Sequence, residues 1–226
     1  MFPLSEDSSG CLDYLRKSED EICEDIVRDI NDGVDGSKIR SGLIGEVGCS
    51  WPITACEKKV LRASVKAQIK TGAPLMIHPG RNPSAPLEII EELRISGADL
   101  KRTIICHIDR TVDNKVVLRK MLESGCVLEY DLFGTEHSYN AFKIGVDMPN
   151  DSVRLKWLNW IIDEGYANQI LISHDIFFKQ QLVHFGGHGY AHILSNVVPM
   201  MRGKKIGDED INRILIENPK RLFTFE

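Results

Sequence analysis

Five short apolar runs alternate with longer amphipathic segments along this chain, and the alternation strongly limits the folds that are open to it. The apolar runs cover residues 43–44, 74–77, 103–106, 127–128 and 170–172. The amphipathic segments, which we predict to be helices, cover residues 20–31, 57–71, 86–96, 113–124, 152–164, about 190–201 and 209–217. Short apolar strands separated by helices are typical of a parallel sheet that is covered on both faces. The sequence therefore predicts an α/β fold.

Capping signals set the ends of two of these helices. Asp151 is the predicted N-cap of the helix over residues 152–164, because a short polar side chain directly before an amphipathic segment accepts a hydrogen bond from its first turn. Asp208 has the same place before the last helix, which is expected to end at Asn218-Pro219.

The composition limits the domain organisation and the classes of partner. Hydrophobic residues make up 42% of the 226 residues and charged residues 27%, so disorder of the whole chain is excluded. No linker rich in glycine, serine or proline divides the chain, which supports one domain over residues 20–226 after a polar segment over residues 1–19. The net charge of −5 and the lack of a long basic run disfavour nucleic acid as a partner. No apolar run approaches the roughly 18 residues of a membrane span, and no signal peptide is expected.

The cysteines indicate a reducing compartment. They lie at positions 11, 23, 49, 56, 106 and 126, and no two of them form a C-x-x-C pair. Cys106 and Cys126 lie beside or within apolar runs, as buried thiols do. We therefore expect reduced thiols in a cytoplasmic protein rather than a disulfide framework.

Acidic residues and histidines follow four of the apolar runs. Glu46, His78, His107 and Asp175 each come at or just after the end of a run, and they are spaced by one or two strand–helix units. In a parallel barrel the carboxyl ends of all strands meet at one face, where active sites lie. Carboxylates and imidazoles together are ligands for zinc. The shared position in the repeat favours a metal site over the separate alternatives, which are a hydrogen-bonded loop histidine, a buried carboxylate and a helix cap.

Other polar features near the C-terminus carry less weight. His184, His188 and His192 have the spacing of one helix face, but Gly186-Gly187 interrupts that helix, so we interpret the spacing as accidental. The glycines there follow no strand directly, which favours a flexible turn over a phosphate loop. His174 precedes Asp175 and is expected to help orient the metal ligands.

Six short motifs together resemble the phosphotriesterase family of the amidohydrolase superfamily over about residues 20–226. They are Gly-Glu-Val-Gly (45–48), Ile-His-Pro-Gly-Arg (77–81), Cys-His-Ile-Asp-Arg (106–110), Glu-Tyr-Asp-Leu-Phe-Gly (129–134), Ser-His-Asp (173–175) and Gly-Gly-His-Gly-Tyr (186–190). The resemblance implies a (β/α)8 TIM barrel of the metal-dependent hydrolase type, with zinc or another divalent metal and two ions per complete subunit.

The resemblance also implies roles for individual residues. Glu46 looks like the carboxylate that bridges the two metals, and His78 and His107 like ligands of the more exposed one. Asp175 is similar to the ligand of the buried metal that also takes a proton in catalysis. Asp109 matches a residue of the family's proton-relay path, and a loop cap is the alternative.

One part of the family's pattern is missing. The buried metal usually takes two histidines from an H-x-H motif on strand one, and this chain has no H-x-H and no histidine before His78. The helix over residues 20–31 is similar to the one that precedes strand four. The expected fold is therefore an incomplete barrel, in which strands four to eight are recognisable and strands one to three are absent.

The family's chemistry leads to an expected function. It is metal-dependent hydrolysis of an amide or ester bond in a small substrate, such as the N-acyl amino-sulfonate N-acetyltaurine. Arg81 is the candidate anion-binding residue, whereas Arg110 is interpreted as a surface ion-pair partner. A catalytically inactive interaction fragment is the main alternative, and a TatD-type metal nuclease ranks below it. The expected partner is a small molecule, not nucleic acid or membrane, and a homodimer is left open.

Overall fold

The computed structural model describes residues 14–136 and 148–225, which form two compact units. Within the described residues, the first unit comprises residues 14–106, 114–127 and 221–225, and the second comprises residues 107–113, 128–136 and 148–220. The first thirteen residues of the predicted polar segment lie outside the described part of the chain.

The first unit contains three parallel strands. They are β1 (Ile44–Gly48), β2 (Leu75–His78) and β3 (Thr103–Ile105), with β2 between the other two. The strands β2 and β3 overlap predicted apolar runs, whereas β1 shares only Ile44 with the run over residues 43–44. Their apolar side chains, except that of Met76, are almost fully buried. The prediction of short parallel strands is confirmed for this unit.

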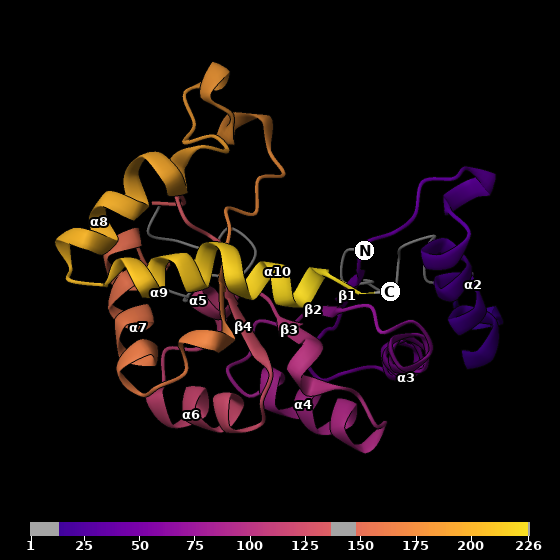
Figure 1. Cartoon of the computed structure of the whole chain (residues 1–226). Coiled ribbons are helices and arrows are strands. Elements are labelled where there is room, and N and C mark those ends of the chain that lie inside the picture. The colour runs from indigo at the N-terminus through magenta and orange to yellow at the C-terminus, as the bar shows by residue number, and fades with distance from the viewer. Residues whose placement is uncertain (1–13, 137–147, 226) are drawn as a thin grey trace. The chain divides into compact units, whose positions relative to one another are not determined.

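The helices of the first unit are α2 (Glu19–Asn31), α3 (Ala55–Thr71), α4 (Ala85–Ile95) and α6 (Lys115–Glu123). In Figure 1, α3 and α4 lie along one side of this sheet, and α2 lies beyond α3. The helix α3 packs against α2, β1 and β2, and α4 packs against α3 and α6. Capping boxes fix where α2 and α3 begin, because Ser18 and Thr54 each exchange two hydrogen bonds with the glutamate three residues later.

The second unit contains two parallel strands and the C-terminal helices. The strands are β4 (Val127–Tyr130), whose first residue belongs to the first unit, and β5 (Ile170–Ile172). The helices are α5 (Ile108–Thr111), α7 (Asp151–Asp163), α8 (Val198–Gly203), α9 (Asp208–Asn212) and α10 (Asn218–Phe223), whose last three residues belong to the first unit. A π-helical turn over residues 193–197 precedes α8, and another over residues 213–217 joins α9 to α10.

The N-termini of α7 and α9 differ from the prediction. Asn150 is the N-cap of α7, and its side chain accepts the backbone N–H of Val153. Asp151 is instead the first helical residue, so its carboxylate is available for other contacts. Gly207 likewise precedes α9, and Asp208 begins it. Both predicted caps are wrong by one position.

The predicted end of the last helix at Asn218-Pro219 is also wrong. Pro219 is the second residue of α10, which continues to Phe223. Proline lacks an amide hydrogen, and Pro219 directly follows a π-helical turn, in which the backbone N–H of Asn218 donates to the backbone oxygen of Arg213. Asn218 anchors this turn, because its side-chain amide donates to the backbone oxygens of Ala167 and Ile170.

The described cysteines are thiols, and all of them but Cys56 are buried. Burial raises the pKa of Cys126 to about 11, so this side chain is uncharged at neutral pH. No described helix has the length and apolar character that a membrane-spanning helix needs.

Candidate metal centre

A β-bulge places Glu46 within β1. Ile44 lies opposite Leu75 and Val47 opposite Ile77, so β1 has one residue more than β2 over this stretch. Gly45 allows the bulge, because its φ is +131° and a Cβ there would come within 2.4 Å of the backbone oxygen of Met76. Glu46 therefore lies in the middle of the strand, and not at its end as the sequence suggested.

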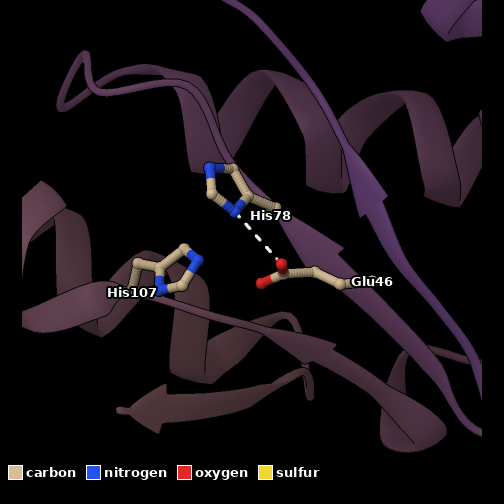
Figure 2. Close-up of side chains that lie close together, drawn as sticks. All are labelled: Glu46, His78 and His107. Carbon is tan, nitrogen blue, oxygen red and sulfur yellow. Dashed lines mark ion pairs between the residues drawn. The ribbon is translucent and has the colours of Figure 1, made fainter. Parts of the chain in front are cut away.

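His78 is the last residue of β2 and pairs with Glu46. The Nδ1 atom of His78 lies 3.2 Å from Oε2 of Glu46. The dashed line in Figure 2 marks this pair. The His78 side chain is nearly buried, at 11% exposure, whereas that of Glu46 is 30% exposed. The carboxylate thus faces an imidazole at a partly open position of the first unit.

His107 lies two residues after the end of β3 and is held by Asp131. The backbone N–H of His107 donates to Oδ2 of Asp131 at 2.9 Å, and the same oxygen lies 2.8 Å from Nδ1 of the imidazole. The contact with Nδ1 does not have hydrogen-bond geometry, so Asp131 fixes His107 through its backbone N–H and places a carboxylate charge beside the ring.

The structure brings three of the four predicted metal ligands together. Glu46, His78 and His107 each offer one ligand atom, and these atoms lie within 4.8 Å of one another (Figure 2). One carboxylate and two imidazoles form a donor set that suits zinc. Asp175 is not a member of this group among the described residues.

Asp175 lies three residues after β5 in a turn that Gln181 holds. The side-chain amide of Gln181 donates to the backbone oxygen of Asp175 at 3.2 Å. Its side-chain oxygen accepts the backbone N–H groups of Phe177 and Phe178 at 2.9 and 2.8 Å. Asp175 has a φ of +45°, a conformation that few residues other than glycine adopt, so the turn depends on these contacts.

Arg81 lies in the loop that follows β2. Its guanidinium is partly buried, and burial lowers its pKa. The neighbouring Gly80 lets this loop pack closely, because a Cβ there would come within 2.8 Å of Ser50 and Trp51. A cation in such a position is stabilised by an anion. Arg110, in contrast, is buried at 8% exposure, so its interpretation as a surface residue is wrong.

Asp109 is fully buried in α5. Its Oδ2 atom accepts the backbone N–H of Leu132 at 3.0 Å and Nε of Arg154 at 2.9 Å. Burial and repulsion from Asp131 raise the pKa of Asp109 to about 6, although Arg154 opposes the shift. A carboxyl group with this pKa can exchange a proton near neutral pH.

Arg154, which pairs with two buried carboxylates of the second unit, was not identified from the sequence. Arg154 is completely buried and pairs with both Asp109 and Asp151. The signal was present in α7, since Asp151 and Arg154 occupy the same face as the apolar Leu155 and Leu158. A charged residue at a core position of a helix indicates a buried ion pair.

Two proteins that are similar to this chain are named as hydrolases. The phosphotriesterase family matches residues 13–223. The chain is 48% identical to the N-acetyltaurine hydrolase of Bos taurus over 220 residues, which are 97% of this chain and 63% of that protein. It is 51% identical to the N-acetyltaurine hydrolase of Dictyostelium discoideum over 207 residues, or 92% of this chain and 56% of that protein. The chain thus spans less than two thirds of the length of both relatives.

Solved structures also match this chain over most of its length. A resiniferatoxin-binding protein from Rhodobacter sphaeroides is 34% identical with a TM-score of 0.90, and the match covers 98% of this chain and 61% of that one. The phosphotriesterase homology protein from Escherichia coli, complexed with phosphate in its active site, is 29% identical with a TM-score of 0.84, covering 93% and 69%. The match over nearly the whole chain confirms the resemblance of the motifs, and the chain belongs to the phosphotriesterase family.

Proposed function

We propose that this chain is a metal-dependent hydrolase that cleaves an amide or ester bond in a small substrate. The observation that carries the proposal is the group of Glu46, His78 and His107, whose donor atoms suit a divalent cation. Two N-acetyltaurine hydrolases are about half identical to the chain, and this supports an N-acyl amino-sulfonate as the substrate class. We also infer that β1 to β5 correspond to strands four to eight of a (β/α)8 barrel.

Each predicted site residue has a task in this proposal. Glu46, His78 and His107 hold zinc or a related cation, which when bound polarises the scissile carbonyl and lowers the pKa of water to about 7. Asp175 accepts the proton that the attacking water loses, and it returns the proton to the leaving amine. Asp109 exchanges that proton with its surroundings, as its raised pKa allows.

A direct assay tests the proposal. The full chain is loaded with zinc and incubated with N-acetyltaurine, and the release of taurine is measured. We expect zinc-dependent release that the variant H78N loses. The exposed His184 provides the matched control, because H184N removes an imidazole outside the site and should retain activity. Zinc binding without any release of taurine would favour the alternative, a catalytically inactive interaction fragment.

Arg81 is proposed to bind the anionic end of the substrate. A guanidinium can donate two parallel hydrogen bonds to a sulfonate or carboxylate, and partial burial strengthens the attraction. We expect R81M to raise KM for N-acetyltaurine by about 10-fold or more, the scale of a lost charged hydrogen bond, and to leave KM for a neutral ester nearly unchanged. Steady-state kinetics on both substrates check this, and equal effects on the two would contradict the role.

A further inference from the structure

Arg154 connects two buried carboxylates of the second unit. Its Nε donates to Asp109 at 2.9 Å and its Nη1 to Asp151 at 2.7 Å, while Nη2 donates to the backbone oxygen of Thr135 at 3.1 Å. The side chains of Arg154 and Asp109 are fully buried and that of Asp151 is 4% exposed. Charge-assisted bonds in such a place are strong and directional, so the three side chains form a rigid unit.

Asp151 extends this unit to His192. Its Oδ2 atom lies 2.7 Å from Nε2 of His192, and its Oδ1 atom also accepts the backbone N–H of Gly134. A carboxylate can only accept, so Nε2 of His192 carries the proton. The other ring nitrogen then accepts the side-chain amide of Asn196, at 3.0 Å. Both nitrogens of His192 are used, so this imidazole is neither a metal ligand nor a base.

Ile193, the residue after His192, contacts His174, the residue before Asp175. The backbone N–H of Ile193 donates to Nε2 of His174 at 3.1 Å. This bond requires a lone pair on Nε2 and therefore places the proton of a neutral His174 on Nδ1. The His174 ring also lies 6.2 Å from that of His192 and stacks at 5.8 Å on that of His188. His188 and His192 thus meet His174, whereas the helix that would align them with His184 is interrupted at Gly186, as expected.

The ring of His188 completes the packing of the histidine cluster. It lies 5.5 Å from the ring of His192 and fills the space beside Gly134, where a Cβ would come within 2.4 Å of it. The orientation of His174 is thus restricted by a hydrogen bond on one side and by packed rings on others. His184 takes no part in the ring contacts of this cluster; its ring meets that of Phe185.

We propose that His192 is a positioning residue for Asp175, acting through Ile193 and His174 and anchored to the protein core by Asp151 and Arg154. Gln181 donates a hydrogen bond to the backbone of Asp175, and Ile193 donates one to the side chain of the preceding His174. The proposal rests on the proposed function in that it gives Asp175 a catalytic task. The chain of contacts itself is independent of that task.

The variant H192Q tests the proposal with two separate readouts. The first is the tautomer of His174, read from long-range ¹H–¹⁵N correlation spectra of the zinc-loaded chain. We expect the Nδ1–H tautomer in the unmodified protein and a mixture of tautomers in H192Q. The second is hydrolysis of N-acetyltaurine, where we expect kcat to fall about 10- to 100-fold, as misplaced catalytic groups cause, and KM to change less than about twofold.

Matched variants separate positioning from general damage. H184Q makes the same replacement at an exposed histidine of the same segment and should change neither readout. N196A removes the amide that meets Nδ1 of His192 from an exposed side chain, and should move both readouts in the same direction by less. If H192Q fails to fold, the N196A variant alone tests the proposal.

The outcomes are distinct. An unchanged His174 tautomer in both H192Q and N196A would overturn the positioning role, whatever the activity. A changed tautomer with an unchanged kcat would also overturn it, because Asp175 would then not depend on the contacts that run from His192 to His174. If the unmodified chain releases no taurine, the proposed function fails, and the tautomer readout still decides whether His192 orients His174.

Discussion

R154M is expected to destabilise this protein by about 3–5 kcal/mol, because it leaves Asp109 and Asp151 buried without their cation. Domains of this kind have a free energy of unfolding of about 5–15 kcal/mol, so a large part of the total would be lost. The methionine fills most of the volume of the arginine stem. The loss would therefore come from the uncompensated carboxylates rather than from a cavity.

Urea denaturation followed by circular dichroism measures this loss. The control is R213M, since Arg213 pairs with Asp210 and Glu209 at the surface and such pairs contribute about 0–1 kcal/mol. A second variant tests the cause, because D109N in the R154M background removes one of the two stranded charges and should recover part of the stability. A loss in R154M no larger than in R213M would show that the buried pair contributes little.

The strands could be predicted from the sequence because their signal is local. Each run of three or four apolar residues coincides with a buried strand, and β5 has the predicted bounds of Ile170 and Ile172. Helix positions were predictable for the same reason. Their ends were less so, since Asn150 and Asp151 are both capable caps and only the tertiary contacts of Asp151 decide between them.

The candidate site was predictable in its ligands and not in their support. Glu46, His78 and His107 share a position in the strand–helix repeat, and a repeat can be read from one sequence. Asp131 directly follows β4, but its role depends on a pairing across 24 residues of chain, and Arg154 lies on a helix and pairs across 45 residues. The bulge at Gly45 was also hidden, since glycine serves turns and helix caps as well as bulges.

Zinc affinity should separate the metal ligands from the residue that orients one of them. H107N removes a proposed ligand and is expected to weaken zinc binding more than about 100-fold, whereas D131N leaves the ligand and removes its orienting carboxylate, which typically costs about 10- to 100-fold. Competition with a chromophoric chelator measures both affinities. H184N, at an exposed histidine outside the group of Glu46, His78 and His107, should bind zinc as the unmodified chain does.

The order of the three affinities is the informative result. Asp131 contacts His107 through both the backbone N–H and Nδ1, so its loss should relax the imidazole without removing Nε2. Equal weakening by H107N and D131N would contradict a purely orienting role for Asp131, whose carboxylate also lies within 4.8 Å of possible ligand atoms of Cys106 and Glu129. If neither weakened it, the zinc would be held elsewhere, and the group of Glu46, His78 and His107 would not be the metal centre of this protein.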